Sequence, residues 1–238
     1  RGEGSMGRDG DRAGNGSVNA LRLFGVAASD GDGLPLAPGT DLVTFRDLAA
    51  IVAETPYSRP ALADGDVTTH RSVVESVFAQ RAILPAPAGV VFRAREALER
   101  WLELHFVTLT DALAYVEGRV GARVHVTRKA ERMTGAIAAV GAGGGTSPAG
   151  ATEEMAIDVG AVAAESFRVL RRHAAASIAI RPAGADGAEA AASFLLERDR
   201  WSAFEEAVQE EARRDFELSF RLTGPWPPYD FVRMQFGR

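Results

Sequence analysis

The sequence predicts an α+β protein of two domains: an N-terminal, smaller antiparallel sheet with helices, and a C-terminal ferredoxin-like domain of order βαββαβ. Residues 216–222 alternate apolar and polar side chains with the two-residue period of a half-buried strand. Residues 94–117 carry apolar side chains at helical spacing. Gly118 and Gly121 follow this segment and supply a helix stop. We therefore expect the domain boundary near Gly118.

The N-terminal domain is expected to span residues 18–118. Its apolar segments predict strands at 20–28, 42–45 and 48–54, a helix at 67–81, a Pro-rich strand or turn at 83–92, and one long helix at 94–117. The stripe of that long helix should comprise Leu98, Trp101, Leu102, His105, Leu109, Ala112, Leu113 and Val116.

The C-terminal domain is expected to span residues 119–223. The pattern predicts strands at 123–127, 177–181, 191–197 and 216–222 and helices at 159–174 and 199–214, which is the ferredoxin-like order. The helices should cover the face that bears Val124, Val126, Ile178, Ile180, Leu218 and Phe220. The other face should be wet and show Arg123, His125, Thr127, Glu217, Ser219 and Arg221.

Two segments hold little that a core could bury. Residues 1–17 are mostly Gly, Asp, Arg and Ser, and we expect a disordered, tag-like segment there. Residues 131–157 form an Ala/Gly-rich insert that we expect to be mobile. Residues 224–238 are richer in aromatics, and we expect this tail to pack back between the domains.

Composition excludes several classes of function. The chain of 238 residues has no cysteine, which excludes disulfides, thiol nucleophiles and Cys-ligated metals. Its net charge of −5 gives no basic footprint for nucleic acid. No run of 18 apolar residues predicts a membrane span and no signal peptide is recognisable, so a cytoplasmic location is expected.

No local pattern points to a cofactor or to catalysis. The glycine cluster at 141–146 lacks the Lys-Ser/Thr of a phosphate loop and the spacing of a dinucleotide fingerprint, so we interpret it as a linker. The histidines, His70, His105, His125 and His173, have no partner at metal-ligand spacing. The acidic residues Glu205, Glu206, Glu210 and Glu211 lie on a predicted helix that also carries arginines near both ends, as on a solvated helix face, and no G-x-S-x-G elbow occurs. We therefore predict a protein that is not an enzyme and that needs no metal or cofactor.

The most specific segment lies near the C-terminus, directly after the last predicted strand. It reads Gly224, Pro225, Trp226, Pro227, Pro228, Tyr229, Asp230 and Phe231. Three prolines exclude a helix or a central strand, so we expect a stiff corner whose aromatic rings are buried at the edge of a core. The motif T-G-P-W-P-P-Y-x-F also resembles the signature near the C-terminal end of sequences in the gas vesicle protein F/L family. In that family a serine is usual at the position of Asp230.

The resemblance extends over most of the chain. Residues 21–26 look like the opening strand of the family, residues 47–52 like its second strand, and His70 to Glu75 like its H-x-x-V-v-e helix. Residues 83–92 keep the Leu-Pro, Gly and Phe of the family's next motif but lack its Arg-Phe pair. This similarity identifies the chain as a divergent member.

The resemblance implies a gas vesicle accessory or minor structural protein that acts in gas vesicle assembly. Its implied partners are the small shell protein GvpA and other gas vesicle proteins, without nucleic acid or membrane, and its implied location is the cytoplasm and the gas vesicle. The motif residues, His70 and those of the corner, would then have structural or interaction roles. Two alternatives stay open: a ligand-binding or regulatory ferredoxin-like module whose pocket is lined by residues 85–92, and an unrecognised hydrolase.

Overall fold

The computed structural model describes residues 19–29, 33–34, 36–57, 63–129, 159–181, 189–232 and 234. These residues form two antiparallel β-sheets and five α-helices, a mixed α/β architecture. The predictions for residues 1–17 and 131–157 concern segments outside this part of the chain. Among the described helices, none combines the length and apolar character needed to cross a membrane.

The first sheet is built from the N-terminal half of the chain. Its strands are β1 (Asn19–Ala28), β2 (Asp41–Phe45), β3 (Leu48–Pro56), β4 (Ile83–Pro85) and β5 (Val91–Phe92). They follow the order β2-β3-β1-β4, and β5 also pairs with β1. Gly25 permits the close approach of β1 and β4, because a Cβ there would lie 2.7 Å from the Leu84 carbonyl oxygen.

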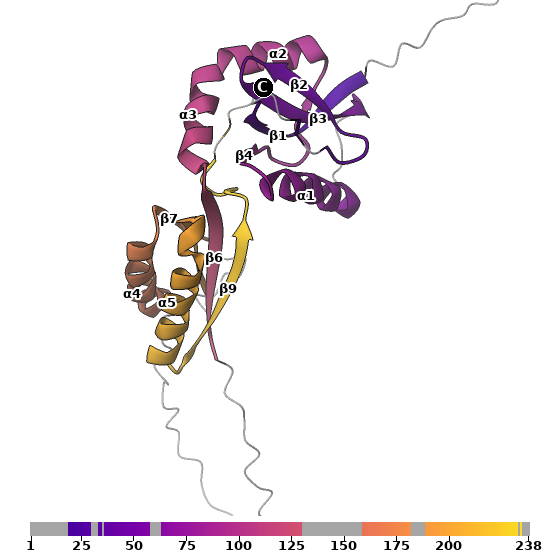
Figure 1. Cartoon of the computed structure of the whole chain (residues 1–238). Helices are drawn as coiled ribbons and strands as arrows, with labels where there is room; N and C mark the ends of the chain where they lie inside the picture. The colour runs from indigo at the N-terminus through magenta and orange to yellow at the C-terminus, as the bar shows by residue number, and fades with distance from the viewer. Residues whose placement is uncertain are drawn as a thin grey trace, which may run out of the picture.

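Helices cover both faces of the first sheet (Figure 1). They are α1 (Asp64–Phe78) on one face and α2 (Arg95–Leu104) and α3 (Phe106–Val116) on the other. Val73, Val74, Val77 and Phe78 of α1 pack on Phe24 and Ile51, whereas Leu98, Leu102 and Leu109 pack on Leu23 and Val52. This two-sided cover explains why β3 begins with five consecutive buried residues instead of alternating.

The prediction of a single helix at 94–117 is wrong, because the helix is interrupted at His105 and forms two segments, α2 and α3. The backbone of His105 leaves the helical region, with φ −103° and ψ 10°, and its ring lies against Trp101 at 5.2 Å. A straight helix contacts a twisted sheet over a limited length only. The break lets both segments keep their apolar stripes on the sheet and leaves Leu104 exposed at the bend.

The second sheet is built from the C-terminal half. Its strands are β6 (Arg119–Arg128), β7 (Ala176–Ile180), β8 (Glu189–Glu197) and β9 (Leu218–Trp226), in the order β7-β8-β6-β9. Helices α4 (Val159–Leu170) and α5 (Trp201–Arg214) pack on one face, over Val124, Val126, Phe194 and Leu218. Short 3₁₀ turns at Arg171–His173 and Arg198–Arg200 replace the predicted ends of the neighbouring helices.

Three expectations about the second sheet need correction. Ile178 and Ile180 were expected under the helices, but they pair with Ser193 and Ala191 and so share the opposite face with Arg123 and His125. Strand β9 starts at Leu218 and continues to Trp226, so the chain leaves the strand at Pro227, three residues later than the predicted start of the corner at Gly224. Pro225 is tolerated because β9 is an edge strand with a register irregularity opposite Gly121 and Arg123. The other face is also not uniformly wet, since Ser193 and Leu195 on β8 are 1% and 0% exposed.

Candidate functional site

A cavity of about 460 Å³ lies between α1 and the second sheet. Its walls come from α1, the loop after β4, the face of the second sheet that α4 and α5 leave uncovered, and the segment 226–231. It is lined by Val67, His70, Arg71, Glu75, Ala86, Pro87, Ala88, Gly121, Arg123, His125, Ser193, Arg221, Thr223, Trp226, Pro227, Pro228, Tyr229, Asp230 and Phe231. Sequence-distant motifs, His70 and the C-terminal corner, thus share one site.

The corner is anchored by its prolines. Pro227 and Pro228 are buried, while Tyr229 and Phe231 are half-buried. Trp226 is 37% exposed, so the expectation that it is a buried packing residue is wrong. The extension of β9 to Trp226 accounts for this, because Trp226 still belongs to the edge strand and only the residues after it cross the sheet.

Beyond the corner, the chain crosses to the first sheet. Tyr229 packs against the buried cluster that includes both α1 and the core of the second sheet, and Val232 and Met234 pack against the cluster beneath α2 and α3. The predicted contribution of Phe236 lies outside the described residues. A second connection joins the same parts, because the guanidinium of Arg198 lies 5.0 Å from the centre of the Phe78 ring on α1.

Gly224 has a conformation and a setting that require glycine. Its φ is +139°, and a Cβ there would lie 2.7 Å from the ring of Trp201 and 2.9 Å from the Gly121 carbonyl oxygen. L-residues rarely adopt such a φ. The glycine therefore lets β9 lie directly on Trp201, the first residue of α5, immediately before the corner.

Asp230 ties the corner to the second sheet. Arg123 on β6 donates two hydrogen bonds to its carboxylate, Nε to Oδ2 and Nη2 to Oδ1, both at 2.8 Å. Ser193 on β8 donates a third to Oδ2. Burial alone would raise the pKa of Asp230, but the hydrogen bonds from Arg123 and Ser193 and the Arg123 charge outweigh it, so the pKa is lowered. Asp230 is thus ionised and forms a two-pronged ion pair.

Sequence reasoning missed this ion pair. Arg123 and Asp230 are separated by 107 positions, and Arg123 was expected on a wet face. The sequence held one signal for this ion pair: Asp230 stands where the family that the chain resembles usually has serine. The second difference from the family pattern, the segment 83–92 that lacks the Arg-Phe pair, also lies at the cavity. Its residues Ala86, Pro87 and Ala88 line it.

His70 is a buried, neutral side chain on α1. It is 5% exposed, and its Nε2 lies 2.9 Å from the Ala86 carbonyl oxygen. Because a carbonyl oxygen only accepts, Nε2 carries the proton and donates it. Burial lowers the pKa of His70, and the hydrogen bond to Ala86 opposes this only in part. The ring also packs against Phe24 at 5.4 Å, so His70 fixes the loop after β4 to α1 and β1.

The other histidines of the described residues have separate surroundings. His125 meets Glu189 at 3.1 Å, His105 contacts Trp101, and His173 is exposed. Burial raises the pKa of Tyr229 to about 12, which keeps its phenol neutral. Within the described ranges, no group of three or more His, Asp or Glu side chains could hold a metal ion.

Comparison with known sequences identifies relatives over nearly the whole chain. The family model "Gas vesicle synthesis protein GvpL/GvpF" matches residues 23–233. Gas vesicle protein F2 of Halobacterium salinarum is 27% identical over 211 residues, covering 87% of this chain and 86% of the relative. Gas vesicle protein F of a Streptomyces species is 26% identical, covering 88% of this chain and 98% of the relative. The resemblance deduced from the sequence motifs is confirmed.

Comparison with solved structures supports the same fold. The crystal structure of gas vesicle protein GvpF from an Anabaena species matches with a TM-score of 0.69 at 17% identity, covering 92% of this chain and 100% of that one. The GvpF structure from Microcystis aeruginosa matches with a TM-score of 0.66 at 15% identity, covering 90% and 99%. At these identities the likeness shows the mixed α/β fold, including both antiparallel sheets.

Proposed function

This chain belongs to the gas vesicle synthesis protein GvpL/GvpF family, and we propose that it acts in gas vesicle assembly by binding the shell protein GvpA and other gas vesicle proteins. Family membership by itself supports a role in gas vesicle formation. The observation that carries the proposal is the extent of the match, residues 23–233, which includes both sheets and the corner up to Phe231. The expected location is the cytoplasm and the gas vesicle.

The same proposal includes the domain plan. The first domain comprises residues 18–118 and the second residues 119–223, with the insert 131–157 inside its sequence; the tail starts at Gly224, its first three residues complete β9, and the described residues after Trp226 lie between the two domains. The second domain is ferredoxin-like: its order strand-helix-strand-strand-helix-strand and its sheet order β7-β8-β6-β9 support this. The tail holds the two domains in one orientation, through Asp230 on the second sheet and Val232 on the first.

In this proposal the protein works by presenting a surface and not by catalysis. The family is one of gas vesicle proteins and is not a known enzyme family. His70 and the corner residues have structural or interaction roles: Gly224, Pro225, Pro227, Pro228 and Asp230 set the path of the chain, and Trp226, Tyr229 and Phe231 contribute apolar surface. An exposed Trp beside arginines is typical of residues that dominate protein interfaces.

A binding assay with the shell protein tests the proposal directly. Purified, tagged protein should retain GvpA and should not retain an unrelated protein of similar size. In a host that carries a gas vesicle gene cluster, deletion of this gene should abolish or reduce gas vesicles, as measured by buoyancy and light scattering. Normal vesicles in the deletion strain, together with no retention of GvpA, would contradict the proposal.

A second candidate function, binding of a small ligand, is favoured by one observation. The sequence analysis left open a ligand-binding module whose pocket is lined by residues 85–92. Ala86, Pro87 and Ala88 of that segment do line the cavity. A volume of about 460 Å³ lies within the range of ligand sites, roughly 300–1,000 Å³. A thermal shift with one member of a metabolite collection, and none with gas vesicle proteins, would favour this alternative.

A further inference from the structure

Among the described residues, the cavity between α1 and the second sheet carries an unpaired cation on each of these two walls. Arg71 lies on α1 and Arg221 on β9, and both residues are exposed. Neither guanidinium forms an ion pair or a hydrogen bond within the part of the chain that the structure describes. Arg123 differs from them, because its guanidinium already donates two hydrogen bonds to the Asp230 carboxylate. An unpaired guanidinium offers a planar set of N–H donors that matches a carboxylate.

Apolar side chains lie beside these cations. Val67 on α1 is 38% exposed and Trp226 at the end of β9 is 37% exposed, although both line the cavity. The buried Pro227 and Pro228 line it as well. Trp and Arg are enriched among the residues that dominate binding between proteins. This combination fits a ligand that presents both a carboxylate and an apolar side chain.

Several backbone groups of this cavity cannot bind a ligand. Pro87, Pro227 and Pro228 have no N–H group, and the Ala86 carbonyl oxygen already accepts the hydrogen bond of His70. The charged side chains of Arg71 and Arg221 supply strong donors for polar recognition.

We propose that this cavity binds an acidic peptide segment of a partner protein, with carboxylates paired to Arg71 and Arg221 and an apolar side chain packed on Trp226. The volume of about 460 Å³ suits a few side chains and excludes a folded domain. Only the partner's identity as a gas vesicle protein rests on the proposed function. Glu75 on α1 lines the same cavity and repels an anion, so it limits the affinity.

The test measures fluorescence anisotropy of a labelled peptide, acetyl-Glu-Phe-Glu-Leu-amide, with the full-length protein. We expect binding that weakens at high salt and is lost with the Gln-for-Glu peptide. Arg71→Gln and Arg221→Gln should each weaken binding about tenfold, the effect of losing a charge-assisted hydrogen bond, whereas Glu75→Gln should tighten it. The matched control is Arg213→Gln, an exposed arginine on α5, across the sheet from the cavity, which should leave binding unchanged.

One further variant tests the cavity without removing a charge. Ala88→Phe should fill the space and abolish peptide binding, with the melting temperature checking that the variant is folded. Equal losses in the Arg71, Arg221 and Arg213 variants would overturn the proposal, as would free glutarate binding as tightly as the peptide. Peptide binding without GvpA retention would leave the cavity proposal standing and refute the proposed partner. The reverse result would refute the cavity proposal alone.

Discussion

The two sheets of the molecule are covered in different ways. The first sheet has helices of its own on both faces, α1 on one and α2 with α3 on the other (Figure 1). The second sheet has α4 and α5 on one face only, and its other face is partly covered by the corner at 226–231 and faces the cavity. The sheet with a closed core is thus suited to a scaffold, and the sheet with an incomplete cover is suited to form a site.

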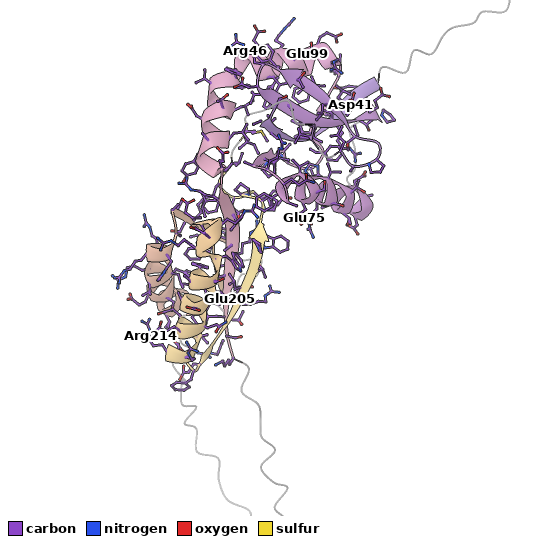
Figure 2. The ribbon with its side chains drawn as sticks, in the orientation of Figure 1. Asp41, Arg46, Glu75, Glu99, Glu205 and Arg214 are labelled. Carbon is purple, nitrogen blue, oxygen red and sulfur yellow. The ribbon has the colours of Figure 1, made fainter. Side chains whose placement is uncertain are left out.

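Charge placement follows the same division. In Figure 2, Arg46 and Glu99 lie at the end of the first part that is remote from the second, while Glu75 lies on α1 at the side that faces the second sheet. Glu205 and Arg214 lie on α5, away from the cavity. Glu205 lies on the exposed side of α5, but Glu211 is only 4% exposed, which corrects the expectation of a wholly solvated acidic face. The charges of Glu75, Arg123 and Asp230 line the cavity. The predictions below test this difference.

The largest effect is expected from opening the closed face of the second sheet. Phe204 on α5 is fully buried and packs against Phe194 at 5.1 Å between ring centres. Phe204→Ala should reduce the free energy of unfolding by about 3–5 kcal/mol. Amide hydrogen exchange should show lost protection in β6 and β8 but retained protection in β1 and β3, because the first sheet has its own cluster beneath α2 and α3. Equal losses in both sheets would mean that the molecule unfolds as one unit.

The next-largest loss of stability is expected at Gly224, where β9 packs on Trp201 of α5. Gly224→Ala places a Cβ against Trp201 at a φ that alanine avoids, and should reduce the free energy of unfolding by about 2–3 kcal/mol. Gly65→Ala is the control, because a Cβ there meets no atom within 4 Å. Denaturant titration of both variants measures the difference. A Gly224→Ala variant as stable as the control would show that the corner can shift without loss.

The ion pair of the corner should make stability depend on pH. Because the pKa of Asp230 is lowered in the folded state, its stabilisation is complete above the unfolded-state value of about 3.9 and disappears as the pH falls through the lower folded-state pKa. Asp230→Asn should therefore cost about 1–2 kcal/mol at neutral pH, and the difference from the unsubstituted protein should vanish in strong acid.

The control for this pair is Glu205→Gln, which removes a carboxylate from the exposed surface of α5. Its effect on the free energy of unfolding should stay within about 0.5 kcal/mol at every pH. If Asp230→Asn behaved like this control, the contact with Arg123 and Ser193 would not hold the corner.

The sequence predicted the regular parts of both sheets and missed the contacts that form the site. The strand from Leu218 to Leu222, within the predicted range 216–222, and the stripe from Leu98 to Val116 were predictable because burial on a strand or helix imposes a local period. The break at His105 and the pair between Arg123 and Asp230 were not, because they depend on how a helix meets a twisted sheet and on a contact across 107 positions. The burial of Trp226 was predicted wrongly for a related reason. An aromatic residue between prolines suggests a buried side chain, and only the structure shows that Trp226 ends an edge strand and is 37% exposed.

The smallest effect on stability, and the sharpest test of the open face, is expected at Trp226. Since its side chain is 37% exposed, Trp226→Ala should cost about 1 kcal/mol and not the 3–5 kcal/mol, roughly, of a buried aromatic. The control is Phe216→Ala, which removes another exposed ring, 78% exposed, just before β9. Both variants should melt close to the unsubstituted protein, yet only Trp226→Ala should lose the retention of a gas vesicle partner, because only Trp226 lines the cavity. A large loss of stability in Trp226→Ala would instead mean that this ring helps to hold the two sheets together, and the face we describe as open would be part of the core.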